Sequence, residues 1–254
     1  MIFNYHTHTK LCGHAKGETK EYIEAAIARG LKTLGFSDHA PYLFPTKERQ
    51  DKPRHSMHLD KLQSYADSVR ALAKEYKDDI RILCGFELEY YPDYHEEEMA
   101  LLRSVSPDYL ILGQHYIGDE SNGRPVHGTT DETTLIAYAT QAIAGLSTGD
   151  FLYLAHPDLP GWKFDKEVAS REYRRVCEFA KKKGIPLEIN FLGLGNNRCY
   201  PSKEFFAIAA EVGNEVILGI DAHTPEAFAA VEVEEKALQM VQELGLKLIE
   251  KDLL

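Results

Sequence analysis

The sequence lacks the features that mark several classes of protein. Its cysteines are few and form no C-x-x-C pair: Cys12, Cys84, Cys177 and Cys199. A disulfide framework or a thiolate zinc site is therefore not expected, whereas reduced thiols are. The first six residues have no basic region followed by an apolar stretch, and no apolar run is long enough to span a bilayer. These absences predict a cytoplasmic protein without a membrane partner.

Positive charge is scarce as well. The chain has 29 Lys and Arg against 40 Asp and Glu, which gives a formal net charge of −11. Because nucleic-acid backbones are bound by clustered Lys and Arg, this balance argues against a nucleic-acid partner. It also means that a site for a phosphate ester would need positive charge from another source, and bound metal ions would supply it.

What the chain does have is a regular alternation of short apolar runs with amphipathic stretches. We expect seven strands, at residues 1–6, 31–38, 80–89, 109–115, 151–156, 186–190 and 216–221, and a short extra strand at 247–250. Helices are expected at 18–29, 58–76, 94–105, 131–144, 166–183, 202–212 and 225–244. A polar loop is expected at 43–57.

The strands predict the fold class. Runs such as Tyr-Leu-Ile-Leu-Gly at 109–113 are continuously apolar, which is typical of parallel strands that are covered on both faces. Seven βα units in one series indicate an α/β barrel, with a doubly wound open sheet as the alternative. No linker, repeat or low-complexity tract interrupts the series, so a single domain over residues 1–254 is expected.

Metal-ligating residue types follow six of the seven expected strands. In order they are His6 and His8, Asp38 and His39, Glu87 and Glu89, His115, His156, and Asp221 and His223. Each alone has a plain structural interpretation: a chance H-x-H, a hydrogen-bonded histidine or, for Asp221, a helix cap. Active sites of α/β barrels lie at the carboxyl ends of the strands, so these residues are expected to meet in space. Burying so many acids and imidazoles without cations would be costly.

The ligand types predict the kind of metal centre. His, Asp and Glu without Cys suit zinc, manganese or iron, and the candidates are too many for one ion. Two or three divalent ions that share a carboxylate would fit, and Glu87 is the expected bridge. Ions about 3.5–4 Å apart can hold a hydroxide between them and lower its pKa.

At this point the residues resemble a known family. His6-Thr7-His8-Thr9, His14, Ser37-Asp38-His39, Gly85-Phe86-Glu87, Gly113-Gln114-His115, Ala155-His156-Pro157 and Gly219-Ile220-Asp221-Ala222-His223 resemble the motifs of the PHP (polymerase and histidinol phosphatase) superfamily. The resemblance spans nearly the whole chain, in order. It implies a distorted seven-stranded (β/α) barrel, TIM-like, with a trinuclear metal cluster at the carboxyl ends of the strands.

The resemblance also implies three ion positions. The first would be held by His6, His8, Glu87 and Asp221. The second would be held by Glu87, His115 and His156, and the third by His14, His39 and His223. His14 lies in the loop Cys12-Gly13-His14, where an exposed histidine without a ligand role is the alternative.

Within the superfamily, the stretches 85–92 and 196–201 look most like stand-alone histidinol-phosphate phosphatases of histidine biosynthesis. The implied reaction is hydrolysis of L-histidinol phosphate by a metal-bridging hydroxide. Arg198 would neutralise the phosphoryl oxygens, because a guanidinium fork matches phosphate geometry; the alternative for it is a solvated loop arginine. Asp38, Asp221 and His223 are candidates for the acid that protonates the leaving alkoxide.

Other residues near the motifs have weaker roles. Glu89 is expected to orient a ligand or to pair with the substrate's amino group, and Asp38 has a second interpretation as a carboxylate that orients a ligand imidazole. Trp162 could contact the substrate imidazole or pack in the core. Residues 54–58 could close over substrate or form a plain polar loop. His95 and His127 are expected at the surface.

Three functions remain open from the sequence. The first is the histidinol-phosphate phosphatase. The second keeps the metals and changes the substrate to a nucleotide, a phosphotyrosine or, as an exonuclease would, a phosphodiester; the acidic balance disfavours the exonuclease. The third is a metal-binding module without catalysis, against which the complete set of ligands argues. The sequence does not predict the identity of the metal, the oligomeric state or any regulation.

Overall fold

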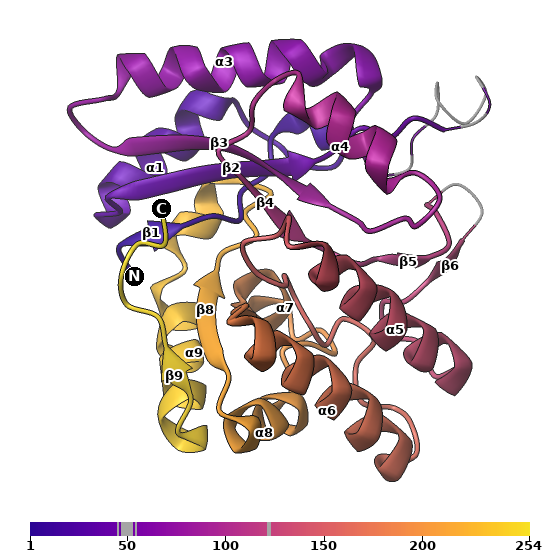
Figure 1. Ribbon diagram of the computed structural model, residues 1–254. Helices are drawn as coiled ribbons and strands as arrows, with labels where there is room; N and C mark the ends of the chain where they lie inside the picture. The colour runs from indigo at the N-terminus through magenta and orange to yellow at the C-terminus, as the bar shows by residue number, and fades with distance from the viewer. Residues whose placement is uncertain (45, 47–52, 54, 121–122) are drawn as a thin grey trace.

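Figure 1 shows the computed structural model, which describes residues 1–44, 46, 53, 55–120 and 123–254. Much of the loop expected at 43–57 therefore lies outside the described residues, and so does Arg54. The larger parallel strands lie inside and helices cover them from outside, and the two chain ends lie near each other beside the first strand, β1 (Phe3–Asn4). The fold is α/β, as the alternating pattern predicted.

The first half of the chain forms a curled parallel sheet in the order β1-β2-β3-β4. The strands are β1 (Phe3–Asn4), β2 (Thr33–His39), β3 (Arg81–Leu88) and β4 (Tyr109–Leu112), and the helices between them are α1 (Thr19–Arg29), α3 (Leu62–Glu75) and α4 (His95–Arg103). Every residue of β2 is buried, as expected for a strand covered on both faces. The register pairs His39 with Glu87, which places two predicted ligands side by side.

The second half contributes a smaller parallel sheet, β7 (Leu187–Asn190), β8 (Glu215–Gly219) and β9 (Lys247–Leu248). Its helices are α5 (Glu132–Thr148), α6 (Lys166–Lys183), α8 (Lys203–Val212) and α9 (Val231–Leu244). Side-chain caps begin three of them: Asp131 accepts from Thr133 and Thr134, Asp165 from Glu167 and Val168, and Ser202 from Phe205. No helix of the described residues has the length and apolar character needed to cross a membrane.

Residues 151–156 connect the two sheets and correct a prediction. They do not form a regular strand: Leu154 makes isolated parallel bridges to Leu112 of β4 and to Leu187 of β7. A third isolated bridge, Thr7 to Ala222, joins the end of β1 to the end of β8. Its hydrogen bonds run from His8 N to Ala222 O (2.9 Å) and from Ala222 N to His6 O (3.2 Å). Parallel pairing thus leads from β1 through both sheets and back to β1.

The long helix predicted at 225–244 is interrupted. A 3₁₀ helix, η3 (Pro225–Ala229), ends at Ala230, and α9 begins at Val231. Arg29 donates a hydrogen bond to the carbonyl of Phe228, which a continuous helix would use for its own ladder. The break is therefore set by a contact with α1 that the local sequence does not reveal.

Among the described residues, four short elements were not predicted: the 3₁₀ helix η1 (Lys10–Cys12), the helix α7 (Phe191–Gly195), and the strands β5 (Tyr116–Ile117) and β6 (Arg124–Pro125), which pair as a hairpin. The helix predicted at 58–76 begins with a 3₁₀ turn, η2 (Leu59–Lys61), before α3. The sequence Phe-Leu-Gly-Leu-Gly of α7 has poor helix propensity. It is helical because Asn190, at the end of β7, accepts a hydrogen bond from Gly193 N at 2.9 Å.

Glu98 of α4 supplies a pH prediction for the fold. Its side chain is 1% exposed, and its one described partner is the backbone N–H of Leu43. Burial raises the pKa of Glu98 to about 8. Between its unfolded pKa of about 4.3 and about 8, the folded protein holds a proton that the unfolded chain releases, so stability falls as pH rises through this window.

We therefore expect Glu98 to contribute a decline of about 3 kcal/mol in the free energy of unfolding between about pH 5 and pH 8. Glu98→Gln should remove this contribution. Urea titrations in the presence of a metal chelator measure it, and Glu97→Gln, on the exposed side of the same helix, is the matched control. An unchanged profile in Glu98→Gln would contradict the prediction.

Candidate metal centre

Glu87 lies at the middle of the predicted cluster. Its carboxylate is 2% exposed and has five imidazoles around it. The nitrogen–oxygen distances are 2.9 Å to His156, 3.2 Å to His39, 3.3 Å to His6, 3.4 Å to His8 and 3.7 Å to His115. A Cβ on Gly113 would lie 1.8 Å from Glu87 Oε1, so only glycine leaves room for this carboxylate. These side chains come from the ends of β1, β2, β3 and β4 and from the segment that ends at His156.

Asp221 forms the second focus. Its Oδ1 lies 3.2 Å from His8 Nε2, 3.3 Å from His223 Nδ1 and 3.4 Å from His6 Nε2. The bridge from Thr7 to Ala222 causes this arrangement, because it aligns the end of β1 with the end of β8. Asp221 has φ 53° and His156 has φ 29°, values that side chains with a Cβ rarely adopt. Backbone strain of this kind concentrates at functional sites.

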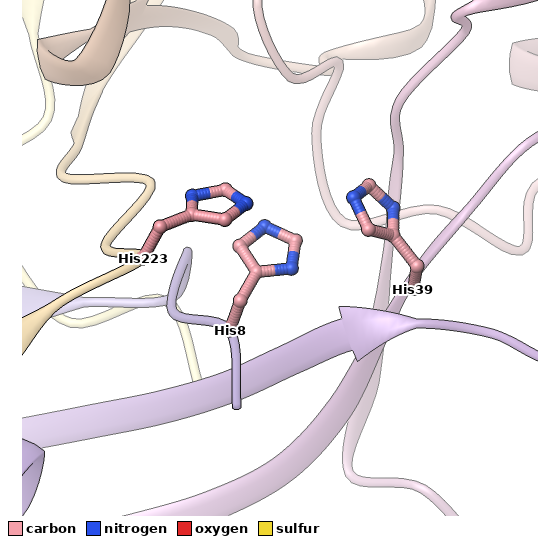
Figure 2. A group of neighbouring side chains, drawn as sticks. All are labelled: His8, His39 and His223. Carbon is pink, nitrogen blue, oxygen red and sulfur yellow. The ribbon is translucent and has the colours of Figure 1, made fainter. Parts of the chain in front are cut away.

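A third focus consists of histidines alone. Figure 2 shows His8, His39 and His223 gathered from three segments that are distant in sequence, with the ring of His8 between the other two. The ring centroids are 4.2 Å apart for His8 and His223 and 4.5 Å apart for His8 and His39. The ring centroid of His14 lies 4.8 Å from that of His223 and 6.3 Å from that of His8. Ligand atoms of His8, His39 and His223 lie within 4.8 Å of one another, close enough to hold one ion.

The donor set of the cluster suits divalent cations. Further groups within the same spacing are His6, His8 and Glu87, and His6, His156 and Asp221. Both ring nitrogens of His8 are buried and have no hydrogen-bond partner among the described residues, and Nδ1 of His156 is in the same position. Buried polar atoms are normally paired, so these nitrogens point to an additional binding partner. Imidazole and carboxylate ligands suit zinc, manganese or iron.

The electrostatics of the cluster point to a cation as well. Burial would raise the pKa of Glu87, but the surrounding histidines, His39 and His6 foremost, hold it well below its ordinary value. Asp221 behaves in the same way beside His6 and His8. Burial would lower the pKa of His6, yet Asp221 and Glu188 hold it well above its ordinary value. The buried carboxylates therefore favour positive charge at this position, whether from protons or from metal ions.

Two histidines of the third focus stay neutral. Burial lowers the pKa of His39 well below its ordinary value. Burial and the positive charge of His8 lower the pKa of His223 to about 3. A neutral imidazole has a lone pair for a metal, so both rings are in the form that binds one.

Glu188 is a buried carboxylate of the cluster that the sequence analysis missed. It belongs to β7, the one strand to which no ligand was assigned, and it is fully buried. Its Oε1 lies 2.7 Å from His6 Nδ1, and its Oε2 accepts from His156 N and Asn190 Nδ2, both at 2.9 Å. A Cβ on Gly219 would lie 1.8 Å from Oε1. Glu188 thus orients one predicted ligand directly and the backbone of another. The sequence did contain one signal for this placement: in Glu188-Ile189-Asn190 the two polar residues alternate with an apolar one and so share a face of the strand.

Glu188→Gln should therefore lower metal affinity about 10–100-fold, because the carboxylate fixes the tautomer and orientation of a ligand imidazole. Competition with a chelating dye would measure this loss. Glu172→Gln is the control, because Glu172 is equally buried but pairs with Arg171 and Arg175 on α6. Unchanged affinity in Glu188→Gln would show that His6 needs no such support.

Asp38 and Glu89 lie behind the histidines. Asp38 is fully buried; its oxygens accept from Thr9 and from the backbone of His39, and Oδ1 lies 3.6 Å from His8 Nδ1. Glu89 accepts from the backbone N–H groups of His115 and Tyr116 at 3.1 and 3.0 Å, and its Oε1 lies 3.4 Å from His115 Nδ1. Neither lines the cavity described next. Both therefore hold the backbone of predicted ligands, His39 for Asp38 and His115 for Glu89, from outside the cavity.

A cavity of about 370 Å³ opens above the cluster. Some of the described residues that line it are predicted metal ligands and the others surround them. The lining residues are His14, His39, His55, Glu87, His115, His127, Leu159, Leu192, Arg198, Tyr200, Asp221 and His223. This volume lies within the range of about 300–1,000 Å³ that small-molecule sites occupy. The cluster is thus open to a small ligand on one side.

Arg198 is the arginine in the wall of this cavity. Its Nη1 donates to Tyr200 Oη at 3.0 Å, and no carboxylate pairs with it in the part of the chain that the structure describes. The ring of Tyr200 lies 5.8 Å from His156 and 5.7 Å from His127. Arg198 is exposed at the cavity, where an anion could reach it.

Some predicted placements differ from the structure. His127 is exposed, as expected, but it lines the cavity. His95 is half-buried and away from the cavity, because it pairs with Asp150 at 2.9 Å. Trp162 stacks on Tyr173, with 5.4 Å between ring centroids, and is not among the described residues that line the cavity. It packs against the edge of the core, which was the alternative placement in the sequence analysis.

The loop at 54–58 reaches the cavity in part. His55 lines the cavity, and its Nδ1 lies 2.8 Å from Tyr116 Oη. Ser56 holds this segment in place, because its hydroxyl donates to Glu120 at 2.6 Å. The expectation that Arg54 could cover substrate falls outside the described residues.

Cys12 was not predicted to belong to the centre, but its sulfur lies beside it. Ligand atoms of Cys12, His14 and His223 lie within 4.8 Å of one another, and so do those of His8, Cys12 and Asp38. Burial would raise the pKa of the Cys12 thiol, but the neighbouring imidazoles of His14 and His8 lower the pKa below its ordinary value. The sulfur of Cys12 therefore lies beside the predicted ligands, a placement that the sequence analysis did not predict.

Several known proteins are similar to this chain. A protein named "Probable histidinol-phosphatase" from Deinococcus radiodurans is 28% identical over 235 residues, which cover 87% of this chain and 85% of that protein. The crystal structure of histidinol phosphate phosphatase from Lactococcus lactis, complexed with zinc, L-histidinol and phosphate, has a TM-score of 0.75 at 19% identity and covers 98% of this chain and 95% of its own.

A more distant structure belongs to the metal-dependent tyrosine phosphatases YwqE from Bacillus subtilis and CpsB from Streptococcus pneumoniae. It has a TM-score of 0.51 at 17% identity and covers 96% of this chain and 91% of its own. At these identities the solved structures establish a shared fold. The family model of the PHP domain matches residues 4–191, well over half of the sequence, and the chain therefore belongs to the PHP domain family.

Proposed function

We propose that the chain is a metal-dependent phosphomonoesterase that hydrolyses L-histidinol phosphate to L-histidinol and inorganic phosphate. The convergence of five imidazoles on the buried carboxylate of Glu87, at the base of a cavity with an exposed arginine, is the observation that carries the proposal. The similarity to the Deinococcus protein, and the histidinol and phosphate in the related Lactococcus structure, support the choice of substrate.

We propose that the centre holds two to three divalent ions. His6, His8, Glu87 and Asp221 would bind the first, Glu87, His115 and His156 the second, and His14, His39 and His223 the third. The buried nitrogens without partners on His8 and His156, together with the buried carboxylates around them, fit such ions. When bound, the ions lower the pKa of water and neutralise charge on phosphoryl oxygens.

The chain's own residues have separate tasks in this proposal. Arg198 binds phosphoryl oxygens through its guanidinium, and Tyr200 holds it by accepting one of its N–H groups. Glu188, Asp38 and Glu89 orient imidazoles from behind, which keeps the ligand atoms in place without reorganisation. Of the three candidate acids, Asp221 and His223 line the cavity, whereas the oxygens of Asp38 are occupied by Thr9 and His39.

We propose further that the fold is a distorted seven-stranded barrel and that residues 1–254 form one PHP-type domain. The seven segments would be β1, β2, β3, β4, the segment around Leu154, β7 and β8. The bridges of Leu154 to both sheets and of Thr7 to Ala222 support this closure. The metal cluster would then lie at the carboxyl ends of the segments, where α/β barrels carry their active sites.

A substrate comparison tests the function. Purified protein with manganese or zinc should release phosphate from L-histidinol phosphate with a kcat/KM at least about 100-fold higher than for phosphotyrosine or a nucleotide. A reversed ranking would replace the substrate and leave the metal centre intact. Metal binding without phosphate release from any of these compounds would support a non-catalytic module instead.

A further inference from the structure

Cys12 has an environment unlike that of the other buried thiols. Cys84 and Cys177 are members of the main hydrophobic cluster of the core. Cys12 is 3% exposed but belongs to neither hydrophobic cluster of the described residues. The groups around its sulfur include His8, His14, His223 and Asp38, so this position is not buried for apolar packing alone.

The sulfur faces metal-ligating atoms on two sides. It lies within 4.8 Å of ring nitrogens of His14 and His223, and in a second group it lies within 4.8 Å of ligand atoms of His8 and Asp38. His8 is completely buried, and neither of its ring nitrogens has a hydrogen-bond partner among the residues described. Zinc–sulfur bonds of about 2.3 Å and zinc–nitrogen bonds of about 2.0 Å place the ligand atoms of a tetrahedral ion about 3.5 Å apart, so these side chains would move slightly inward to bind one ion.

Backbone contacts prepare both histidines to bind an ion. His14 Nδ1 lies 2.9 Å from the carbonyl oxygen of Cys12, and His223 Nδ1 lies 3.0 Å from that of Asp221. A carbonyl oxygen only accepts, so both Nδ1 atoms carry the proton and both Nε2 atoms present a lone pair. This is the tautomer that a ligand histidine needs when its other nitrogen donates to a carbonyl.

The loop that carries Cys12 is held against the end of β8. Lys16 N donates to His223 O at 2.9 Å, and Gly13 N donates to Lys10 O at 3.2 Å. Gly13 has φ 81°, a conformation that a residue with a side chain would adopt only with strain, and it turns the chain between Cys12 and His14. The thiol and the imidazole are therefore fixed on the same side of the loop.

We propose that Cys12 binds, as a thiolate, the ion that His14 and His223 hold. The inference rests on the metal centre proposed above and adds a ligand to its third position. As the sulfur–metal bond forms, the thiol loses its proton to solvent. A thiolate ligand prefers a soft ion such as zinc, whereas the carboxylate-rich positions at Glu87 and Asp221 also suit manganese or iron. The third position thereby differs from the other two in the ion it selects.

Cobalt substitution tests this ligand directly. Protein stripped of metal and titrated with cobalt(II) should show a sulfur-to-cobalt charge-transfer band in the near ultraviolet. The band should be absent from Cys12→Ser and Cys12→Ala and should persist in Cys199→Ser, whose thiol contacts the carbonyl of Leu159 instead. Elemental analysis of the same samples gives the number of bound ions, and circular dichroism shows whether each variant is folded.

Zinc-edge X-ray absorption of the wild-type protein gives a second measurement that needs no variant. One sulfur at about 2.3 Å from zinc is the expected result. Bound cobalt with d–d bands but no charge-transfer band, or zinc with nitrogen and oxygen neighbours only, would overturn the thiolate ligand and leave the proposed centre standing. Protein that binds neither metal would overturn both. Retention of the cobalt band in folded Cys12→Ala would also refute the proposal.

Discussion

Glu87→Gln is expected to lower kcat/KM for L-histidinol phosphate by at least about 1,000-fold, which corresponds to about 4 kcal/mol of lost transition-state stabilisation. The physical reason is the position of this carboxylate, which lies within 3.4 Å of a nitrogen of His6, His8, His39 and His156. A neutral amide removes the negative charge that the first two ions would share, and its N–H₂ group cannot bind them. Fewer bound ions per chain should accompany the loss.

The measurement combines steady-state kinetics with elemental analysis of protein purified without chelator. Glu172→Gln is again the matched control, since it neutralises a buried glutamate on α6 and should leave both values unchanged. If Glu87→Gln kept its full complement of ions and its turnover, the shared carboxylate would have to lie elsewhere. Loss of turnover with metal content unchanged would instead assign Glu87 to the chemistry rather than to binding.

The strand ends could be predicted because their sequence signal is local. Apolar runs mark strands that are buried on both faces, and the polar residue at the end of each run is the first one free to bind a ligand. His39 and Glu87 were expected to meet on this basis, and the register of β2 with β3 pairs them. The family resemblance added the connection to His14, which no strand pattern indicates.

Glu188 could not be found in the same way. It lies inside β7 rather than at its end, and its inward direction depends on pairing with β8, where it is opposite Ile217. A sequence shows that alternate residues share a face but does not show which face meets the cluster. The space for Glu188 depends on Gly219, one strand away, and such a contact is visible only in three dimensions.

The interrupted helix after Pro225 illustrates another limit. Ala-Phe-Ala-Ala has good helix propensity and contains no break signal. The break follows from Phe228, which is buried in the core while its carbonyl accepts from Arg29 of α1. The expected strand at 151–156 is likewise reduced to isolated bridges, because Leu154 pairs with Leu112 of one sheet and Leu187 of the other. Tertiary contacts decide both cases.

Arg198→Ala is expected to lower kcat/KM for L-histidinol phosphate about 100–1,000-fold while leaving the number of bound ions unchanged. The guanidinium lines the cavity without a carboxylate partner in the described parts of the chain, and its contact with Tyr200 leaves its other N–H groups for an anion. Losing a preorganised donor to the phosphoryl group of the transition state typically costs about 3–4 kcal/mol. Because the ions do not touch Arg198 in the proposed centre, metal content should separate this variant from Glu87→Gln.

Arg198→Lys sharpens the interpretation. It keeps the charge but loses the planar fork, so it should recover only part of the activity if two phosphoryl oxygens are bound at once. Arg174→Ala, which removes an exposed arginine paired with Glu211 on the outer helices, is the matched control. Inorganic phosphate, as a competitive inhibitor, reports binding apart from turnover: its inhibition constant should rise in Arg198→Ala and stay constant in the control. An Arg198→Ala variant with unchanged phosphate inhibition would show that Arg198 is a solvated loop residue.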